Sequence, residues 1–176
     1  MAATRQYQKA QAAPEALAFF SDLSRMRQLV AEFTARYSTT EPAERAADAC
    51  HVNSSQSVYA LVGEEMAALA QENLRVVVLN TKYRVLDVVD LYRGTLLSSQ
   101  VRVAEVFRPA IIANAAAIIV VHNHPSGDPA PSPEDVRVTT ALVAAGKLLD
   151  IEVLDHVIVG AAGRYISMKE RRLGFE

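Results

Sequence analysis

The sequence has few of the residues that build disulfides, thiolate metal clusters and membrane spans. Cys50 is the one cysteine among 176 residues, which excludes an internal disulfide framework and a cysteine-based zinc cluster. The longest apolar run, Ala110 to Val121, is interrupted by Asn114 and is shorter than the roughly 20 residues that cross a bilayer. Met1 to Ala13 is polar and rich in Ala and Gln, which does not fit a secretory signal. These absences predict a soluble, cytoplasmic protein that does not associate with a membrane.

An excess of charge of either sign is also missing. The net charge is −2 at pH 7 and the pI is about 6.1, so bulk charge gives no sign of direct affinity for nucleic acid. In contrast, 51% of the 176 residues are apolar, which is enough to bury a full core. The length suits one domain with an appended helical segment.

Two predicted helices form that N-terminal helical segment, which we place at residues 1–51. Met1 to Pro14 has low complexity and few large apolar residues, so we expect it to be loose. From Glu15 to Tyr37, apolar residues recur at the spacing of one helix face. A second, short helix is expected from Glu41 to Cys50.

The remaining residues, 52–176, alternate between helical and strand patterns and are expected to form the main domain. Hairpin and crossover connections both occur among them, which predicts an α/β fold in which helices sandwich a mixed β-sheet. In chain order we expect a helix over 54–70, strands over 74–79 and 84–91 joined by a turn at 80–83, a continuation of the sheet at 94–97, a helix over 103–114, a strand over 115–121, a helix over 134–148, and strands over 151–159 and 165–168.

The most informative stretch runs from Val120 to Asp135 and joins a predicted strand to a predicted helix. The apolar run Ala115 to Val121 has the length and β-branched content of a buried strand. His122 and His124 follow it, and because they are two residues apart both imidazoles point the same way from an extended strand end. A loop rich in Pro and Gly stiffens the chain up to Ser132, where a cap residue, a proline and two acids predict a helix start.

Two imidazoles at the strand end and the carboxylate of Asp135 at the helix start can supply three ligands to one metal ion. The same residues also have a plain structural interpretation. Ser132 and Asp135 nearly have the spacing of a capping box, so Asp135 can simply serve the helix N-terminus. The letters of His122, Asn123 and His124 read H-N-H, but the nucleases named for those letters spread their residues over a ββα unit. Spacing alone leaves metal site and helix cap as alternatives.

The pattern resembles that of the JAMM (JAB/MPN) metalloproteases, in which H-x-H is followed after seven residues by S-x-x-D. The matching residues are His122, His124, Ser132 and Asp135. The longer string H-N-H-P-S-G-D-P-x-P-S-x-x-D resembles one branch of that superfamily, the RadC-like proteins, and this resemblance covers roughly Val52 to Arg172. Further matches to the branch are Arg93-Gly94-Thr95-Leu96 with Ser98, Glu105-Val106-Phe107, Asn114-Ala115-Ala116-Ala117, Ala145-Gly146-Lys147-Leu148-Leu149 and Leu154-Asp155-His156-Val157-Ile158-Val159-Gly160.

The resemblance implies a JAB/MPN-like, cytidine-deaminase-like fold that holds one Zn²⁺ per chain. His122, His124 and Asp135 are the implied metal ligands, which leaves one position for water, as in other catalytic zinc sites. Ser132 is implied to steady the tetrahedral intermediate of amide hydrolysis. Its oxygen can also accept from a helix N–H as a cap.

The general base of the JAMM pattern is an upstream Glu between a helix and a strand, and Glu72 fits that place best. The strand pattern L-R-V-V-V-L follows it closely. Glu64 and Glu65 lie in the middle of a predicted helix and fit less well, and the plain interpretation of Glu72 is a solvated helix end. Asp128 is interpreted as a turn former or as a hydrogen-bond acceptor for a ligand. His156, on a predicted strand, is either a hydrogen-bond partner of a ligand or a buried structural residue, and we favour the structural interpretation.

Three function classes follow. The first is a zinc-dependent peptidase or isopeptidase, whose peptide or protein substrate the sequence does not name. The second is a DNA-repair or recombination factor, the role for which RadC is named. The region before residue 51 lacks the G-x-G-type hairpin of a helix-hairpin-helix DNA module, and the near-neutral charge argues against direct DNA affinity. The third is a metal-bound module that binds a partner without turnover.

Overall fold

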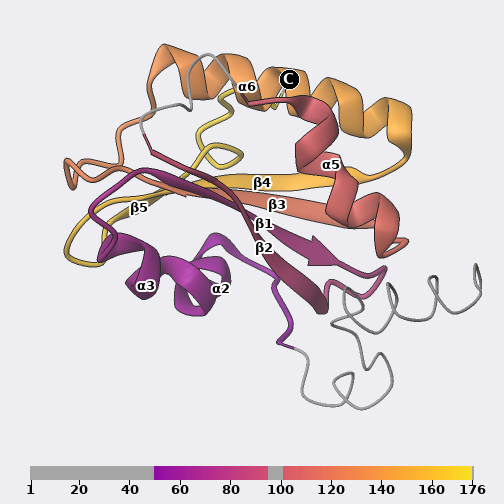
Figure 1. Cartoon of the computed structure of the whole chain (residues 1–176), viewed down its shortest axis with the longest axis horizontal. Coiled ribbons are helices and arrows are strands. Elements are labelled where there is room, and N and C mark those ends of the chain that lie inside the picture. The colour runs from indigo at the N-terminus through magenta and orange to yellow at the C-terminus, as the bar shows by residue number, and fades with distance from the viewer. Residues whose placement is uncertain (1–49, 95–100, 176) are drawn as a thin grey trace, which may run out of the picture. The chain divides into compact units, whose positions relative to one another are not determined.

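The computed structural model describes residues 50–94 and 101–175, and these form a five-stranded sheet with helices on both faces (Figure 1). The strand order is β2-β1-β3-β4-β5. β3 and β4 are parallel, and the other neighbouring strands are antiparallel. The predicted α/β fold with a mixed sheet is therefore confirmed. The strands are β1 (Asn73–Leu79), β2 (Val85–Arg93), β3 (Ala117–Asn123), β4 (Glu152–Val159) and β5 (Tyr165–Ser167).

Most of the expected N-terminal helical segment lies outside the described residues, as does most of the expected continuation of the sheet at 94–97. Of that segment only Cys50 and His51 are described, and they run beside the β1–β2 hairpin. The Val85 N–H donates to the Cys50 carbonyl, and exposed His51 forms an isolated bridge with Arg84.

The two central strands are apolar because both of their faces are covered. Every residue of β1 and of β3 is buried, which explains why the runs V-V-V-L in β1 and A-I-I-V-V in β3 are apolar without alternation. The edge strand β2 is partly or fully exposed along its length. The hairpin turn expected at residues 80–83 joins β1 to β2, with the Tyr83 N–H donating to the Asn80 carbonyl.

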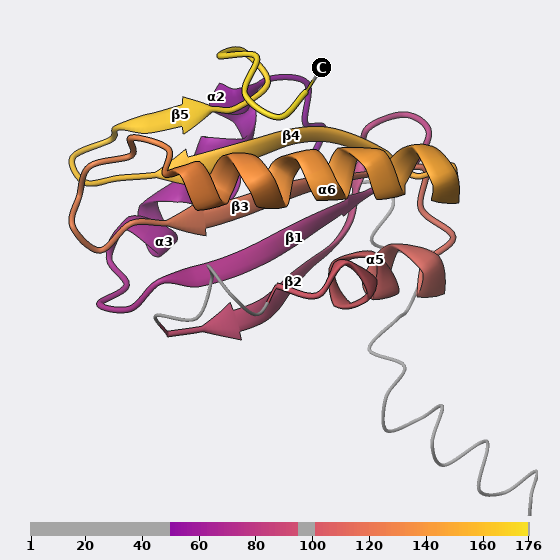
Figure 2. The same cartoon turned by 90° about the horizontal axis from the view of Figure 1, so that it is seen from above.

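Helices cover the sheet on both sides. α5 (Val103–Ile112) and α6 (Pro133–Leu149) lie on one face, while α2 (Ser55–Val58), η1 (Tyr59–Gly63) and α3 (Glu64–Ala67) lie on the other (Figures 1 and 2). Among the described residues, no helix combines the length and apolar content needed to cross a membrane. The core on the α5–α6 side contains Leu74, Val76, Val78, Phe107, Ile118, Val120 and Leu142, and the core on the other side contains Val58, Val62, Met66, Val77, Leu79, Ile119, Val121 and Val157.

The pairing of the strands brings the start of β1, the end of β3 and the start of α6 to one edge of the sheet. β1 and β3 are antiparallel with Leu74 opposite His122, so the start of β1 lies beside the end of β3. The chain then enters α6 and returns as β4, parallel to β3, which places the start of α6 near the end of β3. This edge is where the motif from Val120 to Asp135 folds back on itself.

The helix expected over 54–70 is interrupted by the π-helical turn η1. Adding a Cβ to Gly63 would bring it 2.3 Å from the ring of Tyr59, so this ring lies directly over the Gly63 backbone. The Tyr59 ring also stacks on Tyr165 at 4.9 Å between ring centroids. A ring held between the helix and β5 accounts for the wider turn, which apolar periodicity did not reveal.

The packing of α6 on β4 requires a glycine at position 146. A Cβ there would lie 2.6 Å from the backbone oxygen of Ile151 and 3.1 Å from Cγ2 of Val153. The backbone oxygen cannot move aside as a flexible side chain can. The close approach of helix and strand therefore depends on Gly146.

Gly146→Ala is expected to destabilise the fold by about 1–3 kcal/mol, although Ala is the better helix former. The measurement is the free energy of unfolding in denaturant. The control is Ala144→Gly at an exposed position of the same helix, which reports helix propensity alone and should cost about 1 kcal/mol. A Gly146→Ala protein more stable than the unchanged chain would contradict this account of the packing.

Candidate metal centre

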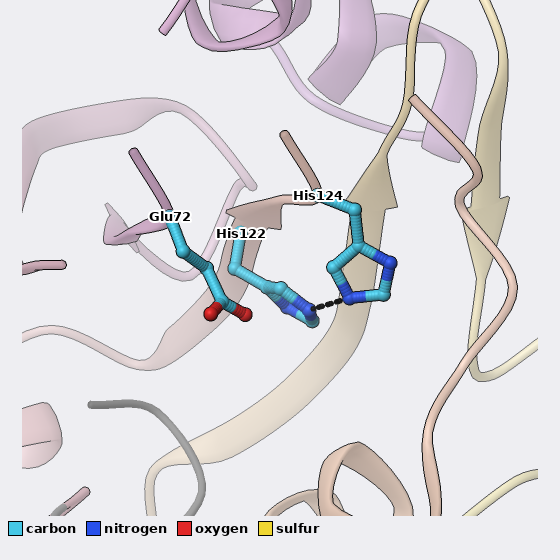
Figure 3. Close-up of side chains that lie close together, drawn as sticks. All are labelled: Glu72, His122 and His124. Carbon is cyan, nitrogen blue, oxygen red and sulfur yellow. Dashed lines mark hydrogen bonds between the residues drawn. The ribbon is translucent and has the colours of Figure 1, made fainter. Parts of the chain in front are cut away.

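The end of β3 directs two imidazoles toward α6. His122 lies on the face of β3 that also carries Ile118 and Val120, which is the face covered by α5 and α6. His124 follows the strand by one residue and faces the same way. The Nε2 atoms of the two rings are 3.0 Å apart (Figure 3).

The start of α6 brings Asp135 to these imidazoles. One Asp135 oxygen, Oδ1, lies 3.3 Å from His122 Nε2, and the other, Oδ2, lies 3.6 Å from His124 Nε2. The capping box that the spacing suggested is also present. The Ser132 N–H and Oγ–H both donate to Asp135 Oδ2, at 2.7 and 2.6 Å, and the Asp135 N–H donates to Ser132 Oγ at 3.1 Å. Asp135 thus both caps α6 and faces the imidazoles.

The environment keeps Asp135 ionised and His122 neutral. Burial alone would raise the pKa of Asp135, but the hydrogen bonds from His124 and from Ser132 outweigh it and hold the pKa well below its usual range. His122 is only 1% exposed, and this burial, helped by neighbouring His156, lowers its pKa well below 6.5. His124 is half-buried, and its hydrogen bond to Asp135 raises its pKa.

Glu72 reaches the same place from β1, the strand paired with β3. It immediately precedes β1, and its carboxylate, His122 and His124 offer ligand atoms that all lie within 4.8 Å of one another (Figure 3). Burial raises the pKa of Glu72, and the negative charge of Asp135 adds to the rise while His124 opposes it. The structure therefore places Glu72 at the histidine pair and not at a solvated helix end. Glu65, by contrast, is paired with Arg75, whose hydrogen bond lowers the Glu65 pKa.

Asn123, between the two histidines, fixes the loop that carries Glu72. Its side chain points to the opposite face of β3 and is only 1% exposed. Its Oδ1 accepts from the Asn73 N–H at 2.8 Å, and its Nδ2 donates to the carbonyls of Gln71 at 3.1 Å and Leu69 at 3.4 Å. The sequence analysis did not identify this role. A polar residue between two same-facing residues of a buried strand is the signal that points to it.

The proline-rich loop orients the ring of His124. The Nδ1 of His124 lies 2.8 Å from the backbone oxygen of Asp128, so Nδ1 carries the proton and Nε2 is left as a metal-binding nitrogen. The Asp128 side chain accepts from the Ala130 N–H, which agrees with its predicted role as a turn former. The loop itself is anchored at Gly127, whose carbonyl accepts from the Ala161 N–H and from Arg164.

Two residues outside the motif are linked to His122, His156 directly and Thr139 through His156. His156 Nε2 on β4 lies 2.8 Å from His122 Nδ1, and His156 Nδ1 lies 2.6 Å from the hydroxyl of Thr139 on α6. Burial lowers the pKa of His156 to about 4. This contact with a candidate ligand fits the alternative interpretation of His156, as a hydrogen-bond partner of a ligand, better than the favoured structural one. Thr139 was not identified from the sequence.

The donor atoms fit a tetrahedral ion such as Zn²⁺. Two ligand atoms that each lie about 2.1 Å from one tetrahedral ion are about 3.4 Å apart. The distances from His122 to His124, from His122 to Asp135 and from His124 to Asp135 are 3.0, 3.3 and 3.6 Å, which bracket that value. Imidazole nitrogens with a carboxylate oxygen are also a common zinc donor set.

We expect about one divalent transition-metal ion to bind per chain, with an affinity that depends on pH. Because the pKa of His124 is raised above 6.5 in the metal-free protein, protons compete for its Nε2 as the pH falls through that pKa. Below it, the affinity should fall about tenfold per pH unit, the slope for displacing one proton. Titration with Co²⁺ or Zn²⁺ at a series of pH values measures this slope.

The control for this titration is the double variant His122→Ala with His124→Ala, which should lose binding at every pH. Binding of the same strength to the double variant, or no binding to the unchanged protein in the absence of chelator, would show that these histidines form no metal site.

Comparison with known proteins identifies a matching family and several similar proteins. The family model described as a RadC-like JAB domain matches residues 52–173. A UPF0758 protein of Chloroflexus aggregans is 56% identical over 125 residues, which is 71% of this chain and 54% of that protein. UPF0758 proteins of Roseiflexus sp. and Clostridium botulinum are 58% and 48% identical over 111 and 120 residues, covering 63% and 68% of this chain and 47% and 52% of their own lengths. The chain thus spans about half the length of the curated relatives it matches. It belongs to the family of RadC-like JAB domain proteins.

Proposed function

We propose that this chain is a zinc-dependent hydrolase of amide bonds, a peptidase or isopeptidase acting on a peptide or protein. The observation that carries the proposal is that the carboxylates of Asp135 and Glu72 both lie beside the pair His122 and His124. Asp135 lies 3.3 and 3.6 Å from the two Nε2 atoms, and Glu72 stands beside the same pair within 4.8 Å. A hydrolytic zinc site needs three protein ligands, with the fourth position left for water, and a separate base.

The two carboxylates are suited to different tasks. Asp135 is held by three hydrogen bonds within the capping box, and its lowered pKa keeps it ionised, as a metal ligand must be. Glu72 has a raised pKa and is only half-buried, so it can take up and release a proton more readily. We therefore assign the third ligand position to Asp135, beside His122 and His124, and the general base to Glu72.

Zn²⁺ bound at such a site acts as a Lewis acid and lowers the pKa of water to about 7. Glu72 would accept the proton of the attacking water and later deliver it to the leaving amine. Asn123 would hold the Glu72 loop at the strand end during both proton transfers. The hydrogen bonds of its side-chain amide fix the backbone on either side of Glu72.

Ser132 is proposed to donate to the oxyanion that forms at the amide carbonyl. The Ser132 hydroxyl donates to Asp135 Oδ2, at 2.6 Å. To donate to an oxyanion, the hydroxyl would have to rotate. The Ser132 N–H would keep its own hydrogen bond to Asp135 Oδ2. The cap and the oxyanion donor are thus compatible roles of one side chain.

Glu72→Gln is expected to leave the metal bound and to lower turnover by roughly 10²-fold or more, because the amide keeps the shape but cannot accept a proton. The assay is hydrolysis of a library of peptide and isopeptide amides, run with and without chelator, alongside a measurement of bound zinc. The matched control is Glu65→Gln, a carboxylate of the neighbouring helix that is committed to Arg75 and should not affect turnover.

Loss of zinc in Glu72→Gln would make Glu72 a ligand. Unchanged turnover would remove it as the base. A protein that binds zinc but hydrolyses none of these amides in its unchanged form would overturn the enzymatic proposal and favour a metal-bound interaction module.

Ser132→Ala separates the two roles of Ser132. Loss of the cap should cost on the order of 1 kcal/mol of stability. Loss of an oxyanion donor should lower turnover per folded molecule by roughly 10²-fold. Ala is a cleaner replacement than Asp, because the Ser132 Oγ lies 2.6 Å from Asp135 Oδ2 and a second carboxylate there would repel it.

The matched control for this change is Ser54→Ala. Ser54 caps α2 through a capping box with Ser57, and α2 covers the other face of the sheet. Both variants should lose stability to a similar extent, measured by denaturant unfolding, and only Ser132→Ala should lose turnover. Equal activity of the two variants per folded molecule would leave Ser132 as a helix cap alone.

A further inference from the structure

A series of hydrogen bonds connects the ring of His122 to the backbone of Asp135 through two side chains outside the motif. His122 Nδ1 lies 2.8 Å from His156 Nε2, and His156 Nδ1 lies 2.6 Å from the Thr139 hydroxyl oxygen. The hydroxyl of Thr139 donates to the carbonyl oxygen of Asp135 at 2.6 Å. The two imidazoles are each 1% exposed and Thr139 is 0% exposed, so bulk water has no access to the series.

The direction of each proton follows from the last member of the series. A carbonyl oxygen can only accept, so the single hydroxyl proton of Thr139 goes to Asp135. The proton between Thr139 and His156 must then come from His156 Nδ1. A neutral imidazole carries one ring proton, so a His156 ring that donates from Nδ1 accepts at Nε2. The proton between the two rings therefore belongs to His122 Nδ1.

We infer that Thr139 and His156 are positioning residues that fix the tautomer of His122 and so present its unprotonated Nε2 to the metal. The inference rests on the proposed zinc centre and adds two residues that the H-x-H and S-x-x-D pattern does not contain. Hydrogen-bond partners of this kind set the orientation and tautomer of metal-binding histidines in other proteins.

Asp135 contacts the His122 ring both through this series and directly, so the contacts form a ring around the proposed metal position. Asp135 ends the series with its backbone carbonyl, and its carboxylate Oδ1 faces His122 Nε2 at 3.3 Å. Rotation of the His122 ring would therefore break the contact with His156 at one nitrogen and lose the ligand geometry at the other. Through His156 on β4, the series ties β3 to α6 independently of the metal.

A merely structural role for Thr139 and His156 would satisfy buried polar groups and nothing more. The two roles differ in what they require of His122. Structural packing is indifferent to which nitrogen of His122 carries the proton, whereas the positioning role allows only Nδ1. The tautomer of His122 is therefore the observable that separates them.

The first test is a long-range ¹H–¹⁵N NMR spectrum of the metal-free full chain, which distinguishes protonated from unprotonated ring nitrogens. Signals are assigned with variants in which one histidine at a time is replaced. We expect a proton on Nδ1 of both His122 and His156. A proton on Nε2 of His122 in the metal-free protein would overturn the inference, whatever the result for metal binding.

The second test measures Zn²⁺ affinity in competition with a chromophoric chelator. Thr139→Val keeps the shape of the side chain but removes the hydroxyl, and should weaken zinc binding by roughly 10- to 100-fold. Thr139→Ser restores the hydroxyl and should restore the affinity. The matched control is Thr140→Val, which removes the same kind of bond, from a hydroxyl to the carbonyl of Val136, at an exposed site and should leave the affinity unchanged.

The outcomes separate this inference from the proposed function. If the unchanged protein binds zinc and folded Thr139→Val binds it equally well, the inference fails and the zinc centre stands. If the unchanged protein binds no zinc, the proposed function fails, and with it the metal-presenting role. If Thr139→Val does not fold, the spectrum of the unchanged chain decides.

Discussion

The geometry of the candidate metal centre depends on the ends of three elements that meet at one edge of the sheet. β1 begins, β3 ends and α6 begins there, because β1 pairs antiparallel with β3 and the chain leaves β3 into a crossover to β4. A slip of one residue in β3 would exchange the side chains of the two apolar cores, so burial on both faces fixes the register. That register sets His122 opposite Leu74 and keeps Glu72 beside the histidine pair.

The start of α6 uses the same groups for folding and for the site. Four orphan N–H groups at a helix start need partners, and Ser132 satisfies one of them by accepting from the Asp135 N–H. Asp135 is held in return by two bonds from Ser132, and this locks the carboxylate toward His122 and His124. The helix cap and the metal centre were alternatives when only spacing was considered. In the folded chain the two are compatible, since the cap orients the carboxylate toward both candidate histidine ligands.

The parts that could be predicted from the sequence are those in which neighbours in the chain are also neighbours in space. The strand end, the stiff loop and the capped helix follow one another within a short stretch, so His122, His124 and Asp135 could be grouped from their spacing. The contacts of Asn123, Thr139 and His156 could not, because they join elements that only the sheet topology brings together. The three upstream glutamates are distinguished chiefly by tertiary contacts, and for Glu65 the deciding contact is with Arg75. The π-helical turn escaped prediction for the same reason, since it depends on a ring that stacks on β5.

The alternation of side chains along β3 divides the centre between the two faces of the sheet. The imidazoles point to the face of α6, while Asn123, between them, points to the face of α3 and holds the backbone beside Glu72. The candidate imidazole ligands and the hydrogen bonds that hold the Glu72 backbone therefore lie on opposite faces of the sheet. A change in the packing of α3 would therefore shift the backbone beside Glu72 while His122, His124 and Asp135 keep their places.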